Sequence, residues 1–138
     1  MAFVWPVRVY WEDTDAGGVV YYANYLKFME RARTEWLRAH GFEQPDLLRD
    51  HSVIFVVRSV QIEYLRPALF DELLDVTVEL SSLGRSQIEV AQRIQYPQGH
   101  EKNGVLTQAS VKLVCVNGQS FKPVAIPAAI KAKIERKS

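Results

Sequence analysis

The strongest constraint on this chain is a cluster of acids and glycines that separates a β-like run from a helical one. Three carboxylates and two glycines fall within seven positions: Glu12, Asp13, Asp15, Gly17 and Gly18. Adjacent glycines let the backbone adopt positive φ angles and let another group approach it closely. We therefore expect a sharp turn here, ahead of a helix from Ala23 to His40.

The position of this turn places a carboxylate just ahead of a helix amino terminus. The unpaired N–H groups at such a terminus carry a partial positive charge of about half a unit. A carboxylate beside such a pocket can attack an acyl group or activate water, while the N–H groups bind the developing oxyanion. The same residues are also common in ordinary turns, where an acid near a helix start stabilises the helix dipole. For Glu12 and Asp13 we keep this second, structural interpretation.

The remaining apolar runs predict an α+β fold built on an antiparallel sheet. We expect strands in five segments: Phe3–Tyr10, Val53–Arg66, Leu73–Leu83, Ser86–Tyr96 and Val105–Val116. A series of strands after one long helix favours α+β over alternating α/β architecture. A short basic helix is expected from Ala128 to Lys137, and Val124 and Ile126 are expected to extend the sheet edge. A length of 138 residues predicts one domain spanning residues 1–138.

Composition excludes several classes of function. The net charge is +1, so no strong field favours nucleic acid or an anionic membrane. No Cys/His grouping has metal-ligand spacing, and we predict no cofactor. The single cysteine, Cys115, lies in an apolar run, which predicts a buried strand residue and not a nucleophile. The absence of a signal-peptide pattern and of a long apolar segment predicts a cytoplasmic protein without a transmembrane helix.

The acidic turn and its flanks resemble the signature of the 4-hydroxybenzoyl-CoA thioesterase family of hotdog-fold enzymes. They are most similar to its Tol–Pal-system-associated acyl-CoA thioesterases, the YbgC family. The matching segments span nearly the whole chain: Tyr10, Glu12–Tyr21, Ala23–Leu26, Phe28, Glu30–Leu37, Phe55–Arg58, Glu63–Tyr64, Pro67–Ala68 and Cys115–Val116. The resemblance implies a sheet of five strands, or slightly more, wrapped around one long helix. It also implies hydrolysis of acyl-CoA to free acid and CoA.

The resemblance assigns roles to particular positions. The family's catalytic carboxylate falls on Asp15, as nucleophile or general base, and its carbonyl-polarising donor is the backbone N–H at Tyr22. Close relatives usually have His where this chain has Tyr22, so an imidazole is not available for proton transfer here. Substrate-binding positions are expected at Gly18, in the acidic turn, and at Arg85 and Lys122. The two basic residues are expected there because CoA carries phosphates that they can bind.

The resemblance leaves alternatives open. Glu30 is the rival catalytic acid, since other hotdog thioesterases use a helix carboxylate as base, but we favour a structural interpretation, an ion pair on the helix face with Arg33 or neighbours near Thr34. The substrate carrier is CoA or, alternatively, acyl carrier protein. A non-catalytic hotdog module that holds an acyl group or a partner is the second class of function, and a structural Tol–Pal accessory factor is a third. Relatives imply a homodimer or homotetramer with the site at the subunit interface.

Overall fold

The computed structural model describes residues 2–137, and every expected strand is present with ends within two residues of the prediction. The elements in chain order are β1 (Phe3–Arg8), the 3₁₀ turn η1 (Trp11–Asp13), α1 (Asn24–Ala39), α2 (Gln44–His51), β2 (Val53–Tyr64), β3 (Leu73–Leu83), β4 (Gln87–Gln95), β5 (Val105–Asn117) and α3 (Ala128–Lys137). Val124 and Ile126 form no strand. Instead, the Val124 N–H donates to Cys115 O at 3.0 Å, beside an isolated bridge at Pro123.

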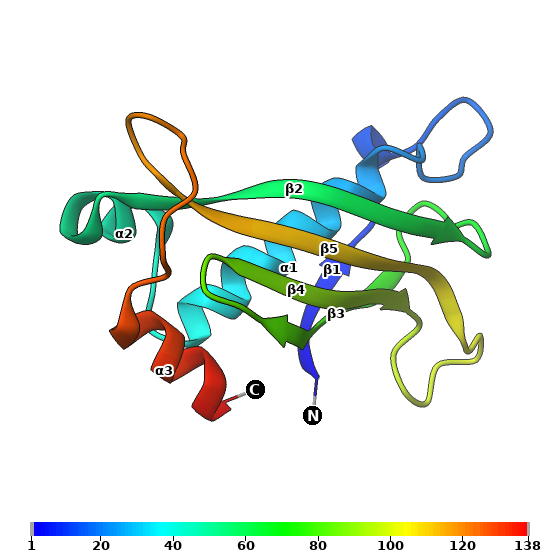
Figure 1. Cartoon of the computed structure of the whole chain (residues 1–138). Helices are drawn as coiled ribbons and strands as arrows, with labels where there is room; N and C mark the ends of the chain where they lie inside the picture. Colours follow the sequence, from blue (N-terminus) through cyan, green and yellow to red (C-terminus); the bar gives the residue numbers. More distant parts are fainter. Residues whose placement is uncertain (1, 138) are drawn as a thin grey trace.

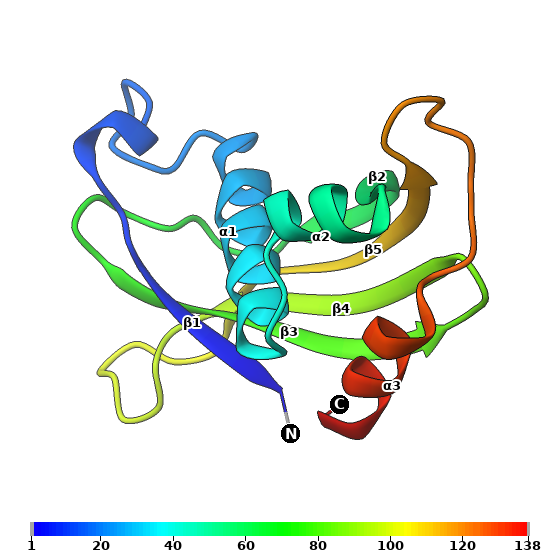
Figure 2. The same ribbon diagram turned by 90° about the vertical axis from the view of Figure 1, so that its left-hand side faces the viewer.

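The five strands form one antiparallel sheet in the order β1-β3-β4-β5-β2. The edge strands are β1 and β2. Pro6 lies in β1 and cannot donate to a ladder, which suits an edge position. The sheet curves around α1, which lies along one of its faces (Figures 1 and 2). The α+β hotdog architecture expected from the sequence is therefore confirmed.

Helix α1 supplies the centre of the core because one face of it is almost wholly apolar. Its buried side chains are Tyr25, Phe28, Met29, Ala32, Trp36 and Leu37. The helix ends where expected: His40 is the C-cap and Gly41 follows with φ of 92°, a conformation that glycine adopts without strain. Polar contacts also join the helix to the sheet, since the buried Gln92 donates to Met29 O at 3.1 Å and accepts from Arg33 Nη1 at 2.9 Å.

The two ends of the sheet carry different loops. The segment that joins β1 to α1 lies at one end, and α2 with the loop that follows β5 lies at the other (Figure 1). The connection from β2 to β3, residues 65–72, lies at the same end as the β1–α1 segment and contacts it. Val20 N–H donates to Ala68 O at 2.9 Å, and Val19 forms an isolated antiparallel bridge with Leu69. This connection therefore supports the segment that holds the acidic turn.

Candidate active site

Asp15 lies in a tight turn that leaves its carboxylate exposed. Gly17 N–H donates to Asp15 Oδ1 at 2.8 Å, and Gly18 N–H donates to the Asp15 carbonyl at 3.0 Å. Gly18 has φ of 79°, so the turn uses the left-handed conformation that its glycine permits. Within residues 2–137, Asp15 Oδ2 accepts no hydrogen bond from the protein. One carboxylate oxygen thus anchors the side chain and the other stays open.

A second turn leads from this segment into α1. Asn24 N–H donates to Tyr21 O at 2.8 Å, and Ala23 has φ of −70° and ψ of −21°, which describes a type I-like turn with Tyr22 at its second position. The Tyr22 N–H finds no acceptor among the described residues. The Tyr22 side chain is exposed. The start of α1 therefore presents an unengaged backbone donor at the position to which the family resemblance assigns the carbonyl-polarising role.

Asp13 has the structural role that the sequence suggested. Its carboxylate is buried and accepts the Tyr10 N–H at 2.8 Å, while its carbonyl accepts the Asn24 side-chain N–H at 2.9 Å. These bonds join η1 to the first residue of α1. Glu12, by contrast, is exposed. The buried acid of the cluster is therefore the one that shapes the segment, while the Asp15 carboxylate stays exposed.

A cavity of about 270 Å³ opens beside Tyr22. It is lined by Val20, Tyr22, Tyr25, Tyr64, Leu65, Arg66 and Pro67. Tyr64 O–H donates to the Tyr22 carbonyl at 3.2 Å, and the Tyr25 and Tyr64 ring centroids are 5.4 Å apart. Burial raises the pKa of the Tyr25 phenol, and the nearby carboxylates of Glu72 and Asp15 raise it further. Tyr25 is thus an electrostatic neighbour of Asp15 and also a wall of the cavity.

Arg85 and Lys122 lie at the other end of the sheet within one chain. The β2–β5 ladder begins with Tyr64 opposite Thr107 and ends with Val53 opposite Asn117. The Lys122 carbonyl accepts the N–H of Asn117, at that second end, and Arg85 O accepts the N–H of Ile126 in the same region. A 12-residue strand is roughly 35 Å long. A single chain therefore does not bring these two cations to Tyr22.

Glu30 lies away from the acidic turn. It lines a separate cavity of about 250 Å³ between α1 and β2, together with Arg33 and Thr34. The expected ion pair with Arg33 does not form, because Arg33 donates to Gln92 Oε1 at 2.9 Å instead. Glu30 thus lies away from the backbone donors at the start of α1, which the proposed chemistry needs, and it does not form the structural ion pair with Arg33 either.

Other groups have no visible role in the chemistry. Cys115 is fully buried, and burial raises the pKa of its thiol to about 11, so it is a structural residue as predicted. Across residues 2–137 no group of three or more His, Cys, Asp or Glu side chains could hold a metal ion. None of the described helices is long and apolar enough to cross a membrane.

Sequence reasoning missed a polar cluster behind the acidic turn. It consists of Glu72, from the connection between β2 and β3, and Tyr96 and Lys102, both from the loop between β4 and β5. No local spacing joins these positions, and the only signal was an acid in the connection between β2 and β3. Tyr64 was also missed as a cavity residue, because it ends a strand whose residues we interpreted only as sheet.

A five-stranded antiparallel sheet around one long helix, with a carboxylate turn ahead of the helix amino terminus, defines the class of hotdog-fold thioesterases. The chain belongs to the thioesterase-like superfamily, whose family model matches residues 9–134. It is 46% identical over 134 residues to the acyl-CoA thioester hydrolase YbgC of Escherichia coli O6:H1, covering 97% of this chain and 96% of that protein. It is also 46% identical to the acyl-CoA thioesterase YbgC of Haemophilus influenzae, covering 94% and 92%.

A solved structure agrees with this assignment. The crystal structure of a probable thioesterase from Bartonella henselae matches with a TM-score of 0.84 and 35% identity, covering 92% of this chain and all of that one. The DHNA-CoA thioesterase from Staphylococcus aureus has a TM-score of 0.85 at 21% identity, which supports the fold alone. The family expected from the acidic turn and its flanks is therefore confirmed.

Proposed function

We propose that this chain hydrolyses acyl-CoA thioesters to free acid and CoA at the Asp15 turn and the start of α1. One observation carries the proposal: an exposed carboxylate with an open oxygen and an unengaged backbone donor lie on consecutive turns ahead of one helix, beside a cavity. The names of the relatives, acyl-CoA thioester hydrolases, support the same substrate class.

In the proposed reaction the thioester carbonyl oxygen accepts a hydrogen bond from the Tyr22 N–H. Such a donor is worth about 3 kcal/mol when charge develops on the oxygen. Asp15 then acts in one of two ways. It attacks the carbonyl carbon, CoA leaves as thiolate, and water hydrolyses the acyl-aspartyl anhydride. Alternatively, it removes a proton from the water that attacks the same carbon. Both roles need only the open carboxylate oxygen, and neither needs an imidazole at position 22.

In this proposal Gly18 contributes by having no side chain, which leaves room for substrate beside the backbone. Its N–H already donates to the Asp15 carbonyl, so it is not available to substrate. A Cβ added at Gly18 would meet no atom within 4 Å, so the space beside this backbone is open. We propose that part of the acyl-CoA lies against it, which is the substrate-binding role that the sequence suggested.

The active unit that we propose is a homodimer formed through β2. Strand β2 pairs with β5 on one side only, so its other edge has unpaired backbone groups over 12 residues. The apolar side chains Val57 and Val60 on this strand are 48% and 36% exposed, an unusual amount for a strand that stays solvated. The other edge, β1, is six residues long and carries Pro6, so it is the poorer edge for pairing.

A dimer of this kind explains the distant cations. Two-fold pairing of β2 with its copy is antiparallel, so the Val53 end of one chain lies beside the Tyr64 end of the other. Arg85 and Lys122 of the second copy would then approach the Tyr22 end of the first, where CoA phosphates need positive charge. A tetramer requires a further contact, for which we propose no surface.

The test is hydrolysis of acyl-CoAs of graded chain length, with acyl carrier protein substrates alongside, by wild type and Asp15→Asn. An asparagine retains the Oδ1 that accepts the Gly17 N–H, so the fold and melting temperature should be unchanged. Loss of the base or nucleophile should lower kcat by about 10³-fold, in the range of such groups. A wild type that binds but does not hydrolyse either substrate would favour a non-catalytic acyl-binding module. Hydrolysis of acyl carrier protein substrates alone would favour that carrier.

Cellular context forms the remaining part of the proposal. We propose a cytoplasmic enzyme, because a single buried cysteine suits a reducing compartment. We also propose association with the Tol–Pal system, which rests on the family resemblance alone. Deletion of the gene followed by tests of outer-envelope integrity would check that association, and an unaltered envelope would remove it.

A further inference from the structure

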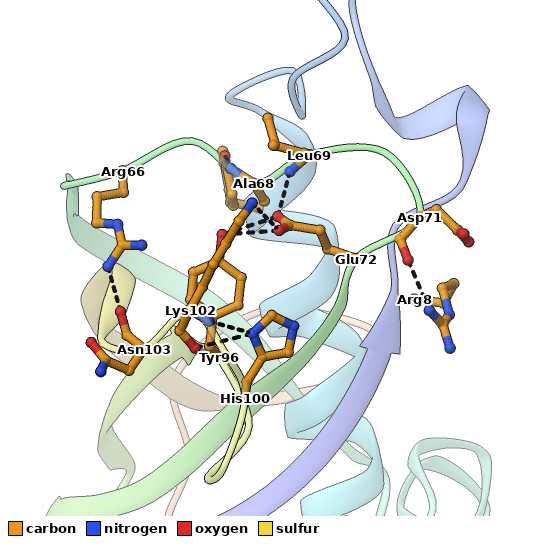
Figure 3. Close-up of polar contacts among 11 residues, drawn as sticks. Arg8, Arg66, Ala68, Leu69, Asp71, Glu72, Tyr96, His100, Lys102 and Asn103 are labelled. Atoms are coloured by element: carbon orange, nitrogen blue, oxygen red, sulfur yellow. Dashed lines mark hydrogen bonds and ion pairs between the residues drawn. The ribbon is translucent and has the colours of Figure 1, made fainter.

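A half-buried polar cluster lies beside the connection between β2 and β3 (Figure 3). Glu72 is its centre, with a side chain only 11% exposed. Tyr96 O–H lies 3.1 Å from each Glu72 carboxylate oxygen, and Lys102 Nζ lies 2.8 Å from Oε2. His100 stacks on the Tyr96 ring at 5.0 Å, so the phenol is packed as well as hydrogen-bonded. Two side chains of the β4–β5 loop, Tyr96 and Lys102, thus converge on one carboxylate of the β2–β3 connection.

The Glu72 carboxylate also holds the backbone of its own loop. Leu69 N–H donates to Glu72 Oε1 at 2.8 Å, and Glu72 N–H donates to Leu69 O at 3.2 Å. Between them Asp71 has φ of 68°, and its carbonyl accepts a hydrogen bond from Arg8 Nη1 at 2.8 Å. An αL residue other than glycine is costly, and it persists here because bonds on both sides fix the loop. Glu72 is therefore the side chain that closes the turn at residues 69–72.

This loop is in turn the support of the catalytic segment. Ala68 O accepts the Val20 N–H at 2.9 Å, and Phe70 N–H donates to Gly18 O at 3.4 Å. On the helix side, the Ala68 N–H donates to the Tyr25 hydroxyl at 3.0 Å. Residues 68–70 thus touch the chain just after Asp15 and the first turn of α1. A shift of this loop would move the proposed carboxylate relative to the Tyr22 N–H.

The electrostatics of the cluster favour an ionised Glu72. Burial alone opposes the charge, but hydrogen bonds from Lys102, from the Leu69 N–H and from Tyr96 hold the pKa of Glu72 below its ordinary value. The pKa of Lys102 is raised, above all by its hydrogen bond to Glu72. At neutral pH the carboxylate therefore accepts three donors at once, which is the charge-assisted arrangement that fixes geometry best.

We propose that Glu72 is a positioning residue for the thioesterase reaction. Its carboxylate, fixed by Tyr96 and Lys102, holds residues 68–70, and these hold the Asp15 turn and the start of α1 in register. This inference rests on the proposed function, since it assumes that Asp15 and the Tyr22 N–H act together. It assigns a role to a residue that does not touch substrate and lies in a different loop from either group.

The test combines kinetics with amide hydrogen exchange in Glu72→Ala. Misplacement of a reacting group by about 1 Å can cost 10²-fold, so we expect kcat to fall about 10- to 100-fold while KM for acyl-CoA changes less than about 3-fold. Hydrogen exchange at the Val20 and Phe70 amides should accelerate about 10-fold or more. The Val20 N–H donates to Ala68 O on the released loop, and the Phe70 N–H, itself on that loop, donates to Gly18 O. Lys102→Met, at an exposed end of the cluster, should lower kcat in the same direction but less.

A rescue experiment separates positioning from general destabilisation. Glu72→Gln keeps an oxygen for the Leu69 N–H but turns an amide N–H toward Lys102, so two donors face each other. Adding Lys102→Met removes that conflict, and the double variant should have a kcat about 3-fold or more above Glu72→Gln alone. The matched control is Glu101→Ala, an exposed acid beside Lys102 with no hydrogen bond in the described part of the chain, which should match wild type.

Unchanged exchange at Val20 in Glu72→Ala would overturn the inference, and so would faster exchange with unchanged kcat. A double variant less active than Glu72→Gln would also contradict it. The failure of the proposed function is recognisable separately: Asp15→Asn would retain activity, while exchange at Val20 in the Glu72 variants would still report whether this carboxylate holds the turn.

Discussion

Replacement of Tyr22 by proline removes one hydrogen-bond donor at the point where we expect the thioester carbonyl to bind. Tyr22 occupies the second position of the turn closed by the Asn24 N–H and Tyr21 O, and proline is favoured at that position. The Tyr22 N–H has no acceptor in residues 2–137, so its removal costs no hydrogen bond of the folded chain. The change is therefore nearly neutral for the fold while it deletes the proposed oxyanion donor.

The matched control is Tyr22→Ala, which loses the same ring but keeps the N–H. Both variants lose the ring contact with Tyr64, whose centroid is 6.2 Å away, and both keep the carbonyl that accepts the Tyr64 hydroxyl. The ratio of their kcat values therefore measures the donor alone. Loss of one oxyanion donor costs about 2.7–4 kcal/mol, so proline should be about 10²- to 10³-fold slower than alanine.

The assay is thiol release from acyl-CoA under saturating substrate, with the melting temperature of each variant measured in parallel. We expect the two variants to melt within a few degrees of each other. A folded Tyr22→Pro protein with a kcat within about 3-fold of Tyr22→Ala would refute the proposal that this backbone N–H stabilises the transition state.

Two further predictions concern the subunit arrangement and the core. Charge reversal at Arg85 and Lys122 should raise KM for acyl-CoA. At low substrate concentration, mixing that variant with Asp15→Asn should give more activity than either alone, because one site of the mixed dimer then has every wild-type group. No recovery after subunit exchange would place the cations outside the site. Phe28→Ala, at a fully buried position of α1, should lower the free energy of unfolding by about 3–5 kcal/mol in denaturant titrations, whereas the exposed Leu26→Ala should cost far less. A loss below 1 kcal/mol at Phe28 would contradict its place in the core.

Local patterns in the sequence predicted helices α1 and α3, the strands and the α+β class, whereas the hotdog arrangement of the sheet around the helix was implied by the family resemblance. The strands and α1 were predictable because apolar periodicity and the terminal Gly41 act over a few residues. The Asp15 turn was predictable for the same reason, since its acid and its glycines are neighbours in sequence. The position of Tyr22 ahead of α1 followed from the same short stretch.

Contacts between residues far apart in the chain could not be predicted from the sequence. Glu72 and Lys102 are 30 residues apart, and Arg33 bonds Gln92, 59 residues away, instead of the nearby Glu30. Strand register also decided where Arg85 and Lys122 lie, because it puts the β5–α3 loop opposite the beginning of β2. Such contacts depend on how the sheet folds around the helix. The spacing of residues along a single sequence does not predict them.

The most direct test of the central claim is a structure of the Asp15→Asn variant with an intact acyl-CoA bound. The account predicts that the thioester oxygen lies within hydrogen-bonding distance of the Tyr22 N–H, with the side chain at position 15 facing the carbonyl carbon. A thioester bound elsewhere, for example beside Glu30 with Tyr22 solvated, would contradict it.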